Sequence, residues 1–176
     1  MFFSDNTVLV NFGHINKLGI LGQISTDFVW CEVVSQECAE SSNHPGLASL
    51  KFANTILGPP WLPTAAEQNL TFERRDEMLR PGEASTKHLG EAETIAIITS
   101  RKINAVFVTD DGGARQSAID KGIPVIDTWD LFRAAYRKNH LGNVQSAYAD
   151  ACTLRTVRKI WPPCGHSLAD FTNWIT

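Results

Sequence analysis

Two adjacent carboxylates, Asp110 and Asp111, follow directly after a short apolar run at residues 105–109. This apolar, β-branched run predicts a strand buried on both faces. The glycine pair that follows predicts a tight turn, after which residues 114–118 begin a helix. In an open α/β sheet, ligands bind beyond the carboxyl ends of the strands. Two neighbouring carboxylates repel each other there unless a cation or a proton intervenes, so we expect a divalent-metal site fed by carboxylates from several strand ends.

The beginning of the chain repeats this arrangement. A very short apolar segment, residues 1–4, runs directly into Asp5, and Asn6 and Thr7 can cap a helix through residues 8–12. One aspartate after a strand is explained equally well as a helix N-cap, and short motifs often occur by chance. Two instances on neighbouring parallel strands point instead to one shared crevice.

Two glutamates could complete such a site from helices. Glu37 lies in a predicted helix over residues 32–40, at the edge of its apolar face. Glu91 lies in the first turn of a predicted helix over residues 90–98. Each also has an ordinary explanation, because glutamate is mostly a surface residue and a glutamate in the first turn stabilises the N-terminus of its own helix.

Strands and helices alternate along the chain. The remaining predicted elements are short strands at 28–31 and 122–128, an edge strand at 61–63, and helices at 46–57, 67–79, 129–136, 144–158 and 168–175. This alternation predicts an α/β fold, a three-layer α/β/α sandwich with a mainly parallel central sheet. We expect a single domain over residues 1–176, with 132–176 as a C-terminal helical extension. The aromatic side chains of the last helix must dock on the domain or on a partner.

The composition sets broad limits on function. With 176 residues the chain can bury a sizeable core, and its 43% hydrophobic and 20% charged residues are ordinary for a globular protein. The formal net charge is −3, which gives no general basic field of the kind that attracts nucleic acid non-specifically. A nuclease is not excluded, because a carboxylate cluster neutralised by metal makes the net charge a poor guide.

The cysteines do not form a zinc motif or an obvious disulfide framework. The chain has neither a Cys-x-x-Cys pair nor repeated His/Cys spacing. Cys164 and His166, separated by one glycine, predict a surface turn rather than a metal site. Without a signal-peptide pattern, and without an apolar run of about 20 residues that could span a bilayer, we expect reduced thiols in a cytoplasmic protein with no membrane partner.

Four segments, in the correct order, resemble characteristic segments of PIN-domain proteins. The match runs discontinuously from residue 1 to about residue 131; it is weak in 41–88 and absent in the tail. Cys31 stands where that family usually has proline. In the following list, the family's pattern stands in parentheses after the residues of this chain. The four segments are 5–10 (Asp-x-Ser/Thr-x-Leu-Ile), 31–37 (Pro-x-x-Val-x-x-Glu), 89–96 (the Gly-Glu-Ala-Glu helix of one branch) and 108–115 with 122–125 and Thr128 (the Thr-x-Asp turn and the last strand).

The resemblance implies a metal-dependent nuclease, most often an endoribonuclease that cuts single-stranded or structured RNA and often the toxin of a bacterial toxin–antitoxin pair. The implied protein partner is therefore an antitoxin. From the residues themselves, an exposed tail and a paired carboxylate face fit either a homodimer or a bound antitoxin. Carried over residue by residue, the acidic quartet is Asp5, Glu37, Glu91 and Asp111. Asp110 shares the site, so that the implied metal ligands are Asp5, Glu91, Asp110 and Asp111. The implied supporting residues are Thr7, Asn11 and Thr109, and Arg115 is a candidate phosphate contact or an ordinary surface arginine.

The chemistry of phosphodiester hydrolysis suits these residue types. It needs an activated water and neutralisation of charge on the phosphate, and one or two hard cations supply both. Mg²⁺ and Mn²⁺ prefer the oxygen ligands of such a carboxylate cluster. Two other interpretations stay open: a non-catalytic binding or regulatory module on the same fold, and a phospho-acceptor receiver domain. The second requires an acid pair after the first strand and a lysine after a late strand, and no lysine directly follows Val125-Ile126.

Overall fold

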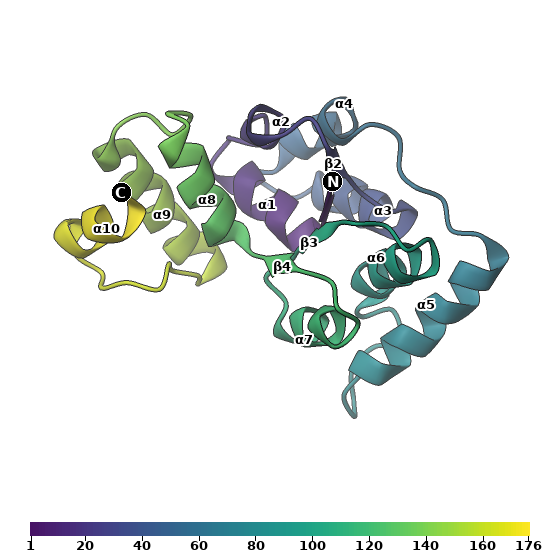
Figure 1. The fold of residues 1–176 in the computed structure, drawn as a ribbon. Helices are drawn as coiled ribbons and strands as arrows, with labels where there is room; N and C mark the ends of the chain where they lie inside the picture. The colour runs from purple at the N-terminus through teal and green to yellow at the C-terminus, as the bar shows by residue number, and fades with distance from the viewer.

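The computed structural model describes residues 1–176, and four short strands form its central sheet (Figure 1). The strands are all parallel and lie in the order β2–β1–β3–β4. Phe3 pairs with Phe107 and Ser4 with Val108, so the first and third strands are neighbours and end side by side. The prediction that both acidic turns follow neighbouring parallel strands is therefore confirmed. The strands are β1 (Phe2–Ser4), β2 (Phe28–Val29), β3 (Val106–Val108) and β4 (Val125–Ile126).

Helices cover both faces of this sheet. On one side α1 contacts α9 and α2 contacts α8, whereas on the other side α6 contacts α5 and α7; Figure 1 shows the sheet between the two groups. The predicted three-layer α/β/α architecture is confirmed, with a sheet that is entirely parallel. The helices are α1 (Asn6–His14), α2 (Ile20–Ile24), α3 (Glu32–Ser41), the 3₁₀ helix η1 (Ala48–Phe52), α4 (Ala53–Leu57), α5 (Ala65–Met78), α6 (Leu89–Ser100), α7 (Gly112–Asp120), α8 (Thr128–Arg137), α9 (Val144–Arg158) and α10 (Leu168–Ile175).

Two predicted elements differ in the structure. The helix expected over 46–57 is divided into η1 and α4. Its buried residues are Leu47, Leu50, Ala53 and Leu57, and their first two spacings of three match the 3₁₀ repeat rather than the α repeat. The edge strand expected at 61–63 is wrong, because only Trp61 pairs, through one isolated bridge to Cys31. The prolines on both sides of Trp61 and Leu62 cannot donate a hydrogen bond and so prevent a longer ladder.

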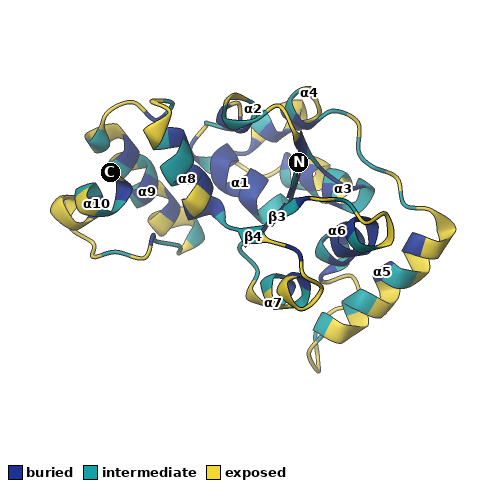
Figure 2. Ribbon diagram, in the orientation of Figure 1, coloured by how far each residue is buried: buried dark blue, intermediate teal, exposed yellow.

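The mixed-charge helix α5 is largely exposed, as expected, but it buries one carboxylate (Figure 2). Glu67 is 2% exposed and closes a capping box with Thr64 at the start of the helix. Its two oxygens accept hydrogen bonds from Arg101 Nε at 2.7 Å and from a terminal guanidinium nitrogen at 2.8 Å. The same guanidinium lies over the Trp61 ring. This bidentate pair attaches α5 to the end of α6.

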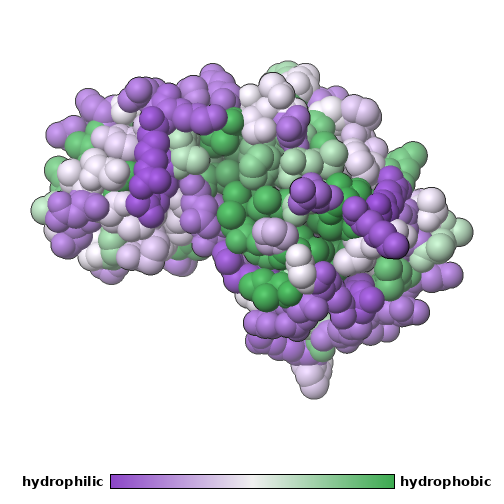
Figure 3. Space-filling model, viewed as in Figure 1, coloured by the Kyte–Doolittle hydropathy of each residue, from purple (hydrophilic) through white to green (hydrophobic).

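The C-terminal helices α8, α9 and α10 gather into one lobe at the far end of the molecule from α5 (Figure 1). Phe171 is fully buried there, with ring centroids 5.4 Å from Tyr148, 5.7 Å from Trp174 and 6.5 Å from Phe132. The aromatic side chains of α10 thus dock on the chain itself. Apolar surface in Figure 3 is concentrated between this lobe and the helices on the other side of the sheet.

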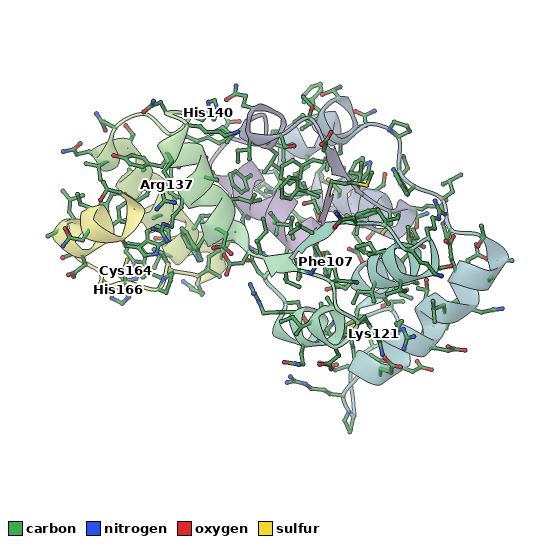
Figure 4. The ribbon with its side chains drawn as sticks, viewed as in Figure 1. Phe107, Lys121, Arg137, His140, Cys164 and His166 are labelled. Atoms are coloured by element: carbon green, nitrogen blue, oxygen red, sulfur yellow. The ribbon has the colours of Figure 1, made fainter.

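All four cysteines are free. Figure 4 places Cys164 and His166 close together in the connection between α9 and α10, in the C-terminal lobe, whereas Phe107 of β3 lies at the centre of the molecule. The pair lies in a bent connection without helix or strand, with His166 exposed and Cys164 half-buried. None of the helices has both the length and the apolar content needed to cross a membrane.

The Glu67–Arg101 pair yields a stability prediction. Arg101→Gln leaves the Glu67 carboxylate buried without its cation, and we expect the free energy of unfolding in urea to fall by about 2 kcal/mol. This value lies between the roughly 1 kcal/mol of an exposed pair and the roughly 3–5 kcal/mol of a fully buried one, because the Arg101 side chain is 33% exposed. Glu77→Gln, which removes a half-exposed carboxylate from its ion pair with Arg74, is the control. Equal losses in both variants would contradict the prediction.

Candidate metal centre

Asp5 leaves the end of β1 and points into the junction with β3. Its backbone N–H donates to the Val108 carbonyl at 3.0 Å, which continues the ladder by one residue, and the side chain is almost fully buried. Asp5 occupies the N-cap position of α1, yet its side chain makes no capping bond. One carboxylate oxygen instead accepts hydrogen bonds from the hydroxyls of Thr7 and Thr109. The alternative explanation of Asp5 as a helix cap is therefore not what the geometry shows.

Asp111 reaches the same junction from the end of β3, and here capping and clustering coexist. Its Oδ1 accepts the Ala114 N–H at 2.8 Å and caps α7. The Asp111 N–H donates to Thr109 Oγ at 3.1 Å, and that hydroxyl donates in turn to Asp5 at 3.1 Å. Thr109 thus links the two aspartates by hydrogen bonds, which agrees with the supporting role expected for it from the sequence.

Glu37 approaches from α3, where α3 packs against the first turn of α6. A Cβ at Gly90 would lie 2.9 Å from Val34 Cγ2 and 3.1 Å from Glu37 Oε2, so only glycine lets the two helices come this close. Glu93 holds the start of α3 from the other side, because its carboxylate accepts the Val33 N–H at 3.0 Å. The Gly-Glu-Ala-Glu segment therefore sets the position of Glu37 as well as carrying Glu91.

The carboxylates of the predicted quartet influence one another strongly. Burial raises the pKa of Asp5 to about 7, and the charge of Glu91 adds to the shift. Burial and then the charge of Asp5 raise the pKa of Glu37 to about 7. Burial raises the pKa of Glu91 to about 7 against its own backbone N–H, with Glu37 and Asp111 contributing. The structure thus brings Asp5, Glu37, Glu91 and Asp111 into one group whose negative charges repel.

Asp110 faces away from this group. Its Oδ1 accepts the Thr128 N–H at 2.9 Å, and its Oδ2 accepts the Thr128 hydroxyl at 2.5 Å and Asn11 Nδ2 at 2.7 Å. Asn11 Oδ1 in turn accepts from Arg158 Nε at 2.9 Å. Burial raises the pKa of Asp110, while the bonds from Thr128 oppose that change. Both oxygens are therefore committed to joining β3 to α1 and α8, and its role as a metal ligand stays a prediction.

Arg115 also turns away from the acidic group. One of its guanidinium nitrogens lies 3.1 Å from Asp127 Oδ2, and Asp127 forms the capping box at the start of α8. The ion pair is about one-third exposed on each side. A phosphate contact by Arg115 stays a prediction, since in the structure the guanidinium is engaged with Asp127.

The sequence interpretation missed His88. This side chain is 8% exposed, and its Nδ1 lies 3.8 Å from Glu91 Oε1 and 4.0 Å from Asp111 Oδ1. Ligand atoms of the three residues all lie within 4.8 Å of one another. Its position three residues before Glu91, on the same side of a helix start, is the signal that could have revealed it.

The donor set fits a divalent cation. Carboxylate oxygens suit Mg²⁺ and Mn²⁺, and an imidazole nitrogen suits first-row transition-metal ions. Burial, and then mutual repulsion, raise the pKa of Asp5, Glu37 and Glu91, and protonation or cation binding would offset both effects. The buried Nδ1 of His88 has no hydrogen-bond partner, and such an atom is unfavourable unless something binds it.

These pKa values predict how stability depends on pH and metal. Between about pH 4 and pH 7 the folded state holds more protons on Asp5, Glu37 and Glu91 than the unfolded chain does, so their contribution to stability falls as the pH rises. In EDTA, Asp5→Asn should therefore raise Tm near pH 8, by about 2–4 °C for each 1 kcal/mol of repulsion relieved, and less near pH 6. MnCl₂ should raise the wild-type Tm more near pH 8 than near pH 6.

Scanning calorimetry checks both expectations, with Asp120→Asn at the exposed far end of α7 as the control. A Mn²⁺-induced shift that is the same at the two pH values would show that the ion does not displace protons from Asp5, Glu37 and Glu91.

Comparison with known proteins supports the resemblance to PIN domains. A family model described as a PIN domain matches residues 1–150, which include every element that carries the site. No match is found among curated proteins or among solved structures. Since the matched residues make up most of the 176 in the chain, the chain belongs to the PIN-domain family.

Proposed function

We propose that this chain is a metal-dependent endoribonuclease in which Asp5, Glu37, Glu91 and Asp111 form the active site. PIN domains are in general nucleases, hydrolases that act on nucleic acid and use divalent metal ions. The observation that carries the proposal is the convergence of four carboxylates from two strand ends and two helices. Three of them have a pKa near 7 because they are buried beside one another.

The contacts suggest a division of labour among these residues. A bound Mg²⁺ or Mn²⁺ supplies Lewis acidity, polarising the phosphate and a water molecule. Asp5 and Asp111 would hold the ion, since Thr109 fixes both of them at the ends of β1 and β3. Glu91 would complete the ligand set. Glu37, with a pKa near 7, would orient the attacking water and accept its proton, because a base works best when its pKa is close to the working pH.

Three further residues would position the ligands without binding the ion: Asp110, Asn11 and Thr7. Thr7 donates to the same oxygen of Asp5 as Thr109 does, which leaves the other oxygen available for the ion. Asp110 and Asn11 fix the turn after β3 against α8. This role uses contacts that the structure already contains, and it explains why the turn carries two acids although one faces the site.

RNA cleavage tests the proposal directly. End-labelled single-stranded RNA and DNA of matched sequence are incubated with the protein in Mn²⁺, Mg²⁺ or EDTA. We expect metal-dependent cutting of RNA that falls by about 10²-fold or more in Asp5→Asn, Asp111→Asn and Glu91→Gln, the scale seen when a catalytic group is removed. Asn keeps the ability of Asp111 to cap α7.

Asp120→Asn controls for loss of one negative charge on the same helix, and it should cut within about twofold of wild type, since exposed substitutions away from a site have small effects. If Asp5→Asn or Asp111→Asn cut RNA at the wild-type rate, the quartet assignment would be wrong. A folded wild-type protein that binds RNA without cutting it would favour the non-catalytic binding module.

We further propose that the nuclease acts as the toxin of a toxin–antitoxin pair, with a small antitoxin protein as its partner. The support is the likeness of residues 90–93 to the Gly-Glu-Ala-Glu branch. Induced expression in a bacterial host should arrest growth, and Asp5→Asn, expressed at the same level, should leave growth unchanged. Arrest by both proteins would show that the effect does not come from RNA cutting.

A further inference from the structure

The side chain of His88 lies at the edge of the acidic quartet with one nitrogen unused. The residue is only 8% exposed, and Nδ1 has no hydrogen-bond partner although it is shielded from solvent. This nitrogen faces Glu91 Oε1 at 3.8 Å and Asp111 Oδ1 at 4.0 Å. A buried polar atom normally has a partner, so the orphaned nitrogen next to two carboxylates indicates a missing one.

The other ring nitrogen is oriented by a different carboxylate. Nε2 lies 3.6 Å from Glu83 Oε2. Glu83 is itself held in place, because it accepts hydrogen bonds from Lys87 Nζ and, at 2.9 Å, from the Arg80 N–H. Carboxylates face both ring nitrogens, and the nearest is that of Glu83 beside Nε2. With the proton on Nε2, the lone pair of Nδ1 is directed at Glu91 and Asp111. Histidines that bind metals usually have such a carboxylate on their second nitrogen.

The backbone at His88 adopts an unusual conformation. The residue has φ 63° and occupies the N-cap position of α6 without making a capping bond. Non-glycine residues rarely adopt the left-handed conformation, and when they do the strain is often retained for function. Here that conformation turns the imidazole toward the quartet instead of along the helix.

We propose that His88 is a metal ligand together with Glu91 and Asp111, and that its imidazole makes the site prefer a first-row transition-metal ion such as Mn²⁺ or Co²⁺ over Mg²⁺. The proposal rests on the proposed function for the use of that ion in RNA cleavage. Ligand atoms bound at about 2.1 Å to one ion at right angles lie about 3.0 Å apart. The two distances from Nδ1 are 3.8 and 4.0 Å, so the side chains would have to move together by about 1 Å to bind one ion.

The competing explanation is a protonated His88 that only neutralises its neighbours. An imidazolium between Glu83, Glu91 and Asp111 would form ion pairs and would bind no metal. The two explanations differ in the nitrogen–metal bond, which can be detected directly, and in selectivity, since imidazole suits transition-metal ions and poorly suits Mg²⁺.

Pulsed EPR of Mn²⁺ bound to the untagged wild-type protein is the first test. We expect modulation from a coordinated ¹⁴N nucleus, which is absent in His88→Asn and retained in His44→Asn, where an exposed histidine is replaced. Asparagine is the preferred replacement because it tolerates a positive φ. Mn²⁺ bound with oxygen ligands alone in the wild type would overturn the proposal, even if the variant failed to fold.

Calorimetric titration with CoCl₂ and MgCl₂ tests the selectivity. His88→Asn should weaken Co²⁺ binding by about 10- to 100-fold, the range typical of damage to a metal site, and change Mg²⁺ binding much less. Glu83→Gln should weaken Co²⁺ binding by about 10-fold. Equal losses for both ions in His88→Asn would contradict the selectivity. These readouts need no RNA, so a wild-type protein with the nitrogen signal but no cutting would overturn the proposed function and leave His88 as a ligand.

Discussion

The site depends on the parallel pairing of β1 with β3. Both strands are three residues long, and they end together because Ser4 pairs with Val108. The bond from the Asp5 N–H to the Val108 carbonyl extends this pairing to the first residue of the site. A shift of one residue between strands would turn each side chain to the opposite face. It would turn Asp5 to the other face of the sheet, away from Thr109, so the register of a few backbone bonds determines where the charge lies.

The same pairing makes the site electrostatically unfavourable without a cation. Phe3 and Phe107, the paired residues two positions before Asp5 and Thr109, are fully buried and exclude water from beneath the site. Burial is accordingly the largest cause of the raised pKa of Asp5, Glu37 and Glu91. Burial of the apolar core offsets the repulsion among the carboxylates in the folded state. A ligand that binds only the folded chain stabilises it in proportion to its binding, so the repulsion among the acids is a source of metal affinity.

The sequence predicted the parts of the site that local pattern determines. Asp5 and Asp111 follow apolar runs, and this pattern placed both at strand ends. Glu37 and Glu91 each had an ordinary explanation as helix residues, and they entered the quartet through the resemblance to the PIN-domain family. For His88 the local signal was its position three residues before Glu91. Glu83 had no such signal, because nothing in residues 80–88 indicates that this connection folds back over the start of α6. The direction in which Asp110 faces was also hidden, since its partners Asn11 and Thr128 lie 99 and 18 residues away in the chain. Among the elements, the 3₁₀ helix and the missing edge strand show where proline and a spacing of three outweighed a general helix or strand pattern.

The C-terminal lobe helps to position the site through one chain of hydrogen bonds. Arg158, at the last turn of α9, donates to Asn11, which donates to Asp110 and Thr128. Asn11 is 1% exposed, so its amide must find partners inside the protein, and these three residues satisfy it. The aromatic packing of α10 against α8 and α9 fixes the helix that carries Arg158. The tail therefore does more than cover apolar surface, because it holds in place the network that aims Asp110 away from the quartet and leaves Asp111 to face it.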